Sequence, residues 1–335
     1  MKLRLAVIYG AIALLISSAS AQPTTSKKNE VKTGANAAMT PDPASGKIVM
    51  EDRFKIDTST DGKERQFPSV YRFGDNIFVS YSEHPDAIIA SPVDAMVISR
   101  DNGKTWTEKV QHSDFYLTSL VEKGGILYGV AYFTYPDSAQ KERMIYWVSA
   151  DMGKTWSRHK GAVRAPAGRQ FKPMPTAWGS MLFHRGMRVM DDGSFQGPMY
   201  GYFDGDSIYT TAWAKSTDHC ATWQIVSTIA AGVPEGDYKN PDGYCEPTFA
   251  KTRDGSLLCV LRIGSFLPLC QSRSLDNGAT WSKPVPLPGL TSKESESVDP
   301  QLLLMSNGIL ALSYGRPDDK IAFSTDGCGY KRDYP

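Results

Sequence analysis

An octapeptide of the form S-x-D-x-G-x-T-W recurs along the chain and constrains its fold more than any other feature. It occurs as SRDNGKTW from Ser99, SADMGKTW from Ser149, STDHCATW from Ser216 and SLDNGATW from Ser274, with a degenerate copy, STDGCGYK, from Ser324. Successive copies start 50, 67, 58 and 50 residues apart. Repetition at this spacing indicates a fold built from units of one kind.

The chemistry of the octapeptide is that of a tight turn. An Asp followed two residues later by Gly lets the carboxylate accept backbone N–H bonds while Gly takes the positive φ. The Trp at the end then covers the turn. The repeated Asp residues are therefore predicted to be structural rather than catalytic.

Short β-strands are predicted between the octapeptides. The runs 77–82, 126–133, 256–261 and 309–314 are rich in β-forming residues and are bounded by Gly, Asn and Asp. Nothing in the sequence has the period of a long amphipathic helix. Roughly four strands and one turn motif per unit is typical of the blades of a β-propeller.

The N-terminal residues 1–21 have the pattern of a secretory signal peptide. Lys2 and Arg4 precede an apolar run at 5–16, and the small residues before Gln22 form a cleavage site. The apolar run is too short for a membrane anchor, and no later stretch reaches the roughly 18 apolar residues of a spanning helix. The product is therefore expected to be secreted or periplasmic, with no membrane span.

The remaining chain divides into two parts. Residues 22–46 are rich in Thr, Ser, Lys, Ala and Asn without periodicity, which predicts a flexible leader. Residues 47–335 are predicted to form the propeller, as a monomer. With 37 basic and 36 acidic side chains the net charge is +1, which argues against nucleic acid as a partner.

The five Cys and five His residues show no metal-site spacing, so neither metal nor cofactor is expected. Cys259 and Cys270 lie symmetrically on either side of a predicted turn at 264–265. They are expected either to form a disulfide in an exported protein or to remain buried thiols.

On its octapeptides the chain resembles the sialidase (neuraminidase) superfamily, in which they are called Asp boxes. The resemblance covers about residue 67 to the C-terminus. It implies an all-β, six-bladed β-propeller in which each Asp box lies between the third and fourth strands of its blade, away from the active site. Five boxes, with 19 residues after Arg316, amount to about five blades. The sequence thus predicts a propeller that is incomplete at its C-terminal end.

Two predicted hairpins each bring an acidic residue beside an arginine. The turn at 254–255 pairs Glu246 with Arg262, and the turn at 307–308 pairs Asp299 with Arg316. Each pair alone could be a salt bridge that stabilises its hairpin. Two pairs at one end of a propeller favour a binding funnel, since isolated surface bridges add little stability.

The resemblance gives these residues roles. Sialidases hold the substrate carboxylate with three arginines, whose guanidinium groups bind carboxylates bidentately. Arg262 resembles the second of the three and Arg316 the third, with Asp299 beside it in the binding site. Glu246 would polarise a tyrosine nucleophile. The resemblance implies that this tyrosine lies on a blade that follows the fifth box. After Arg316 the chain has only Tyr330 and Tyr334, in a predicted turn and outer strand, so the nucleophile is not assigned to either.

The first arginine of the family motif is replaced here. The segment Arg65-Gln66-Phe67-Pro68 has Gln66 at the matching position, and Arg65 points to the opposite face of a regular strand. Either Arg65 is brought to the site by a bulge, or Arg53 substitutes, or the sugar acid is held differently.

A general acid/base is expected after the first inner hairpin, which ends near residue 82. Asp86 is favoured by position, with His84 as its hydrogen-bond partner, and Asp94 follows shortly after. A solvated loop is the alternative interpretation of this segment.

Two function classes follow. The first is an exo-acting glycoside hydrolase of the exo-α-sialidase type, which releases terminal sialic acid or a related acidic sugar from glycans. The second is a non-catalytic carbohydrate-binding propeller, or a lyase or hydrolase for another acidic sugar. The two acid–arginine hairpins favour the first, whereas Gln66 favours the second.

Overall fold

The computed structural model contains strands and turns throughout the part of the chain that it describes. The described residues are 2–8, 11–17, 49–50, 54–57, 61–85, 93–106, 108–174, 179–265, 267–287, 298–315 and 319–330. Within these ranges there is no helix, and hence none long and apolar enough to cross a membrane. The all-β prediction is confirmed.

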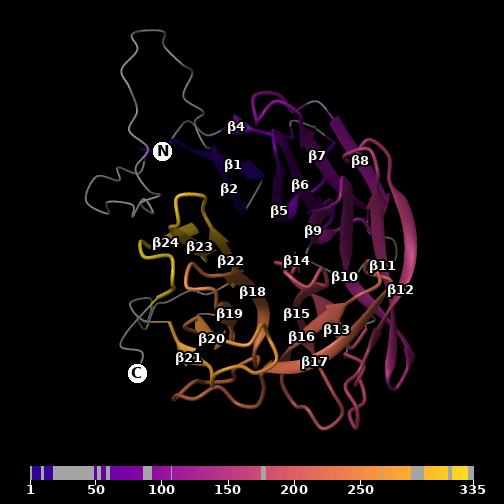
Figure 1. Ribbon diagram of the computed structural model, residues 1–335, viewed down its shortest axis with the longest axis vertical. Coiled ribbons are helices and arrows are strands. Elements are labelled where there is room, and N and C mark those ends of the chain that lie inside the picture. Colours follow the sequence, from indigo (N-terminus) through magenta and orange to yellow (C-terminus); the bar gives the residue numbers. More distant parts are fainter. Residues whose placement is uncertain are drawn as a thin grey trace, which may run out of the picture.

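Successive antiparallel meanders are arranged around a common axis (Figure 1). The first meander is β5 (Gln66–Phe73), β6 (Asn76–Ser82), β7 (Val93–Ser99) and β8 (Glu108–Ser113). The second is β9 (Leu117–Lys123), β10 (Ile126–Ser138), β11 (Lys141–Ser149) and β12 (Ser157–Arg164). The third is β13 (Met181–Phe183), β14 (Arg188–Val189), β15 (Phe195–Gly201), β16 (Thr210–Ser216) and β17 (Thr222–Ala230). Parallel pairing of β12 with β17 joins the second and third meanders into one nine-stranded sheet.

The fourth and fifth meanders complete the series. The fourth is β18 (Cys245–Lys251), β19 (Leu257–Arg262), β20 (Cys270–Ser274) and β21 (Val285–Pro286). The fifth is β22 (Val298–Leu304), β23 (Leu310–Gly315) and β24 (Asp319–Ser324). The four strand runs predicted from the sequence lie in β6, β10, β19 and β23.

A further sheet is formed by residues near the N-terminus. It consists of β1 (Lys2–Ile8), β2 (Ala11–Ser17), β3 (Val49–Met50) and β4 (Phe54–Lys55). Strands β1 and β2 form an antiparallel hairpin. In Figure 1 this hairpin lies between β5 and β22.

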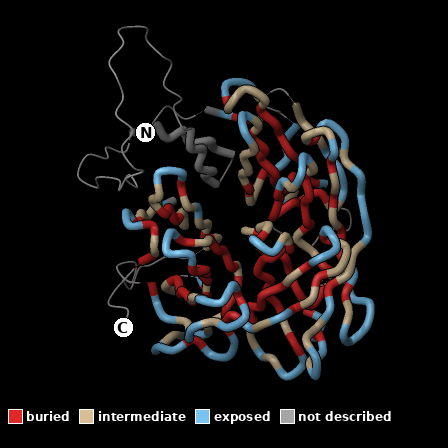
Figure 2. Tube along the Cα trace, viewed as in Figure 1, coloured by how far each residue is buried: buried red, intermediate tan, exposed pale blue. Residues whose placement is uncertain are grey.

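The core lies between neighbouring meanders, where their faces pack together. Figure 2 shows buried residues concentrated on the strands and exposed residues at the turns. Between the first and second meanders, Phe78 and Met96 pack against Leu117 and Trp147. Between the third and fourth, the fully buried Trp213 meets Phe249 edge to face at 4.6 Å between ring centroids. Apolar contact of this kind fixes the order of the meanders around the axis.

The Asp boxes have the predicted turn geometry. In the first box, Ser99 Oγ accepts the Gly103 N–H at 2.8 Å and Asp101 Oδ1 accepts the Thr105 N–H at 2.9 Å. The Trp106 indole donates to Gly103 O at 3.2 Å and covers the turn. The second and fourth boxes repeat these bonds around Asp151 and Asp276. The first, second, fourth and fifth boxes follow the third strand of their meanders. The third box follows β16, which is third in its meander once the short off-path strand β14 is set aside.

The box carboxylates predict a loss of stability in acid. Hydrogen bonds from the backbone and side chain of the box threonine lower the pKa of Asp101, Asp151 and Asp276 to about 2. A carboxyl group whose folded pKa lies below its unfolded value of 3.8 contributes stability above that value and loses it as the pH falls. The melting temperature is therefore expected to drop between about pH 4 and pH 2.

The triple Asp→Asn variant at these positions tests whether the box carboxylates cause the loss of stability in acid. It is expected to melt lower than the wild type at pH 7 but to change less between pH 4 and pH 2, because asparagine does not titrate. Asp237→Asn, at an exposed position, serves as the control. An equally steep acid dependence in the triple variant would assign the effect to other carboxylates.

All five cysteines are free thiols. Cys259 lies opposite Ser272 and Cys270 lies opposite Leu261, so the two cysteines are two residues out of register on neighbouring strands. The disulfide alternative is therefore wrong, and the buried-thiol alternative holds. Burial raises the pKa of Cys270 to about 12, which keeps its thiol protonated.

Candidate functional site at the mouth of the propeller

The innermost strands of three meanders begin with the same backbone irregularity. A register shift occurs between residues 66 and 69 in β5, between 245 and 248 in β18, and between 298 and 301 in β22. In each, the residue before a proline has a positive φ: 55° at Phe67, 42° at Glu246 and 51° at Asp299.

These positive φ angles are energetically unfavourable. Non-glycine residues rarely adopt the left-handed region, and a following proline favours extended backbone instead. Each such residue costs about 1–3 kcal/mol, and residues of this kind cluster at functional sites. The three bulges lie at the end of the strands opposite the Asp boxes. We call this end of the axis the mouth.

Glu246 and Arg262 lie side by side at the mouth, as the turn at 254–255 predicts. Arg262 Nη1 donates to Glu246 Oε1. Arg262 Nη2 donates to Asp242 Oδ2 at 3.1 Å and to Ser265 Oγ at 3.0 Å. The second oxygen of Glu246 accepts the backbone N–H of Asp299 at 3.0 Å. Glu246 therefore links the fourth meander to the fifth.

The predicted partner of Asp299, Arg316, lies outside the described residues. The register of this hairpin also differs by one residue from the prediction. Leu302 is opposite Leu312, because the turn is a three-residue loop closed by the Met305 N–H to Ile309 O bond. The bulge at Asp299 shifts the register again at the mouth.

Arg185 is the arginine that pairs with Asp299. Its Nη2 donates to Asp299 Oδ2 at 2.7 Å, and its Nη1 donates to Pro68 O at 2.6 Å. Arg185 follows β13 in the third meander, whereas Pro68 lies in β5 and Asp299 in β22. One buried guanidinium thus connects three meanders across the axis. Sequence reasoning missed this residue, and no local signal singles it out.

His184 is the second mouth residue that the sequence did not reveal. Its Nδ1 donates to Pro247 O at 2.9 Å, and its Nε2 lies 3.6 Å from Asp299 Oδ1. Burial, together with the nearby Arg185 charge, lowers the pKa of His184 to about 4. The imidazole is therefore neutral at pH 7 and acts as a positioning contact rather than as a counter-ion.

Tyrosine side chains form one wall of the mouth. The hydroxyl groups of Tyr132 and Tyr200 are hydrogen-bonded to each other, and the His184 ring packs against both at 6.1 and 5.8 Å. Burial raises the pKa of both tyrosines well above 10, and the Glu246 charge acts in the same direction. Both are therefore neutral phenols beside Glu246.

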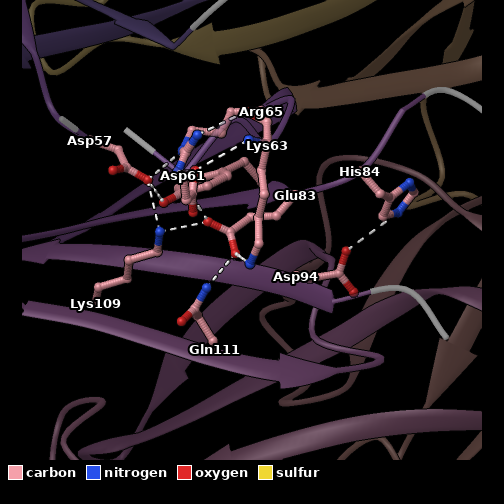
Figure 3. Close-up of polar contacts among 10 residues, drawn as sticks. Asp57, Asp61, Lys63, Arg65, Glu83, His84, Asp94, Lys109 and Gln111 are labelled. Atoms are coloured by element: carbon pink, nitrogen blue, oxygen red, sulfur yellow. Dashed lines mark hydrogen bonds and ion pairs between the residues drawn. The ribbon is translucent and has the colours of Figure 1, made fainter. Parts of the chain in front are cut away.

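Arg65 and Gln66 diverge, as expected for neighbours on a strand. Arg65 Nε donates to Asp57 Oδ2 at 2.6 Å and Nη2 donates to Asp61 Oδ1 at 2.8 Å, in a charged cluster that also holds Glu83 (Figure 3). Gln66 Nε2 donates to Glu64 Oε2 at 2.5 Å. Among the described residues, neither side chain touches Glu246 or Asp299.

Asp86 lies outside the described residues, but Asp94, which ends the same segment, is described. Asp94 is buried, and its Oδ2 accepts the Phe115 N–H at 3.1 Å. The Nε2 of His84 lies 3.8 Å from Asp94 Oδ1 (Figure 3). Burial raises the pKa of Asp94 to about 7 even though backbone N–H groups oppose the shift. This carboxyl group can therefore donate or accept a proton near neutral pH.

Tyr330 and Tyr334 are the two tyrosines downstream of Arg316, and neither is predicted to be the nucleophile. The Tyr330 hydroxyl donates to Ala322 O at 3.2 Å, within the apolar cluster of the fourth and fifth meanders. Tyr334 lies outside the described residues, as does Arg53. No group of three or more potential metal ligands occurs in the described ranges.

Comparison with solved structures relates the fold to known proteins. A protein of unknown function from Dyadobacter fermentans DSM 18053 aligns with a TM-score of 0.59 and 16% identity, over 81% of this chain and 80% of its own. The Hadza microbial sialidase Hz136 aligns with a TM-score of 0.58 and 18% identity, over 78% of this chain and 56% of its own. An alpha-L-arabinanase from Penicillium chrysogenum, complexed with arabinobiose, gives 0.55 and 16%, over 78% of each chain.

Comparison of sequences supplies the family. A search of curated proteins gives no match. Residues 122–320, more than half of the chain, match the family model described as a BNR repeat-like domain. Together with the Asp boxes and the propeller-like meanders, this match shows that the chain belongs to the BNR repeat-like domain family.

Proposed function

We propose that this protein is an exo-acting glycoside hydrolase of the sialidase type, which releases terminal sialic acid or a related acidic sugar from glycans. The observation that carries the proposal is the contact of Arg262 with Glu246 and Asp242 at a strained mouth. The fold shared with a sialidase and an arabinanase, both enzymes that act on glycans, supports the same class.

Arg262 is proposed to bind the carboxylate of the sugar. Its Nη2, which donates to Asp242 Oδ2 and Ser265 Oγ, is the proposed donor to the substrate. Arg316, at the end of the neighbouring hairpin, is proposed as the second arginine. Gln66 is proposed to contribute an uncharged donor, while Arg65, held by Asp57 and Asp61, supports the rim of the mouth.

Glu246 is proposed as the carboxylate that activates the nucleophile. Its two oxygens are fixed by Arg262 and by the Asp299 N–H, so its orientation is set before substrate binds. Asp299 is proposed to act through Arg185, which it holds in place across the axis.

The general acid is proposed to come from the segment that carries Asp86 and ends at Asp94. A general acid must be protonated to act, so an acid with a pKa of about 7 makes kcat/KM fall as the pH rises above 7. Asp94→Asn is expected to remove this fall of kcat/KM above pH 7. Asp86→Asn is expected to leave the pH at which kcat/KM falls unchanged. If Asp86→Asn alone abolishes turnover and Asp94→Asn leaves the pH profile intact, Asp86 is the acid.

The test of the proposed function is a substrate panel. The purified protein is incubated with fluorogenic α-sialosides, α-L-arabinosides and neutral glycosides, and released sugars are identified by mass spectrometry. Release of sialic acid or another terminal acidic sugar is expected. Release of a neutral sugar alone would contradict the proposed substrate class.

A second candidate function is carbohydrate binding without turnover, or action on another acidic sugar. The observations that favour it are Gln66 in place of an arginine and the neutral phenols of Tyr132 and Tyr200. Retention of acidic glycans on an array, together with no released sugar in the panel, would identify a binding propeller.

The protein is also proposed to be exported, with cleavage after Ala21, and to form about five blades of a six-bladed circle. Cleavage would remove β1 and β2 from the position between β5 and β22. The intact mass of the exported protein is expected to correspond to a chain that starts at Gln22. A mass that includes residues 1–21 would show that the hairpin stays in the mature protein.

A further inference from the structure

A cavity of about 360 Å³ lies along the axis, bounded by the innermost strands of all five meanders. Its walls come from β5, β9, the segment from Arg185 to Arg188, β18 and β22. The Arg185 bridge to Pro68 and Asp299 lies at its mouth side. A cavity of this size holds a small ligand with room to spare.

The charge of the cavity wall is strongly one-sided. Among the described residues that line it, three are arginines, namely Arg72, Arg185 and Arg188, and none is acidic. Arg185 is paired with Asp299. Arg188 has no hydrogen-bond or ion-pair partner among the described residues, and its nearest aromatic contact is the Phe249 ring, 6.0 Å from its Cζ. A ring face is a weak substitute for a counter-ion.

Further donors around the cavity also lack acceptors. Arg185 Nε and Ser69 Oγ are buried without a partner among the described residues. Thr248 Oγ1 accepts the Leu302 N–H, so its own hydrogen remains available to donate. Together with Arg188, these groups give the cavity N–H and O–H donors from the first, third and fourth meanders.

An unpaired guanidinium in such a place is costly. Burial lowers the pKa of Arg188, and no carboxylate offsets the loss of hydration. Buried donors without acceptors carry a similar penalty. A ligand that accepts several hydrogen bonds and carries negative charge would remove both penalties at once.

We propose that the axial cavity binds a small oxyanion, with Arg188 as its principal ligand and Ser69, Thr248 and Arg185 Nε as further donors. Phosphate and carboxylate share this acceptor chemistry, because both present charged oxygens to N–H and O–H groups. The bound anion connects the first, third and fourth meanders. The site is separate from the proposed hydrolysis and does not depend on turnover.

The experiment measures the melting temperature against inorganic phosphate in dilute buffer. A ligand that binds only the folded state stabilises it by mass action, so a rise of roughly 5–10 °C is expected at one hundred times Kd. Sodium chloride at equal ionic strength controls for the general effect of salt on charge interactions. Sodium acetate tests whether a carboxylate binds. A rise with acetate alone would assign a carboxylate, and a rise with phosphate would assign a phosphate-type ligand.

Arg188→Met provides the decisive variant. Replacing an unpaired, half-buried cation by an apolar side chain of similar length is expected to leave the anion-free melting temperature equal or higher, and to abolish the response to anions. Arg188→Lys keeps the charge and is expected to retain a weaker response. Arg164→Met, at an exposed arginine, is the matched control and is expected to respond like the wild type.

Calorimetric titration of the wild type with inorganic phosphate and with acetate completes the test, since it requires no variant to fold. One site per chain for at least one of the two anions is expected. The proposal is overturned if neither anion binds, if sodium chloride acts as strongly as both, or if Arg188→Met responds like the wild type.

Discussion

Glu246→Gln is expected to lower kcat/KM on an acidic glycoside by roughly 10²–10⁴-fold, the usual contribution of a positioned acid or base. Glutamine keeps the shape of the side chain and an acceptor for the Asp299 N–H, but it removes the negative charge beside Arg262. Initial rates of fluorogenic sialoside hydrolysis give the measurement. The proposed role requires the loss to appear mainly in kcat.

The control for this prediction is Glu122→Gln, an exposed glutamate at the turn between β9 and β10. This turn lies at the opposite end of the strands from the mouth, so full activity is expected. Arg262→Ala is expected to raise KM as well, because it removes the group that binds the sugar acid. Undiminished turnover by Glu246→Gln would exclude Glu246 from the reaction. A fall in melting temperature large enough to account for the lost activity would make the role of Glu246 structural.

Arg185→Met is expected to destabilise the folded protein by roughly 3–5 kcal/mol, the cost of breaking a buried ion pair on one side. The substitution leaves Asp299 without its guanidinium partner and leaves Pro68 O with only the longer bond from Gln301 Nε2 at 3.4 Å. Burial already raises the pKa of Asp299, and the attraction of Arg185 is what opposes the shift. Urea unfolding followed by fluorescence gives the measurement.

The double variant Arg185→Met/Asp299→Asn separates the pair from simple packing. Removing both charges is expected to recover a substantial part of the lost stability, because no unpaired carboxylate remains. Strict additivity of the two single variants would show that the bridge across the axis contributes nothing as a pair.

The features that the sequence predicted are local ones. An Asp box closes within eight residues, so its serine, aspartate and threonine carry the whole turn. The Glu246–Arg262 contact follows from one hairpin and its turn length. The fifth meander shows the limit of that reasoning, since a three-residue loop at 306–308 moved the register by one residue.

The features that the sequence did not predict join distant segments. Arg185 and Asp299 are 114 residues apart, and His184 reaches Pro247 across 63 residues. Such contacts depend on the order and tilt of the meanders, which no local pattern encodes. Arg65 shows a related limit. The alternation of side chains along a strand predicted that Arg65 and Gln66 point to opposite faces, but only the fold reveals that Arg65 forms salt bridges with Asp57 and Asp61.

The recurring bulge also bears on how such a protein changes over evolutionary time. One backbone device presents Phe67, Glu246 and Asp299 at equivalent places in three meanders. Each of these side chains can therefore be exchanged without rebuilding the chain around it. A single codon change at residue 67 would put a third polar group where an aromatic ring now packs beside Tyr116, while the scaffold of strands stays constant.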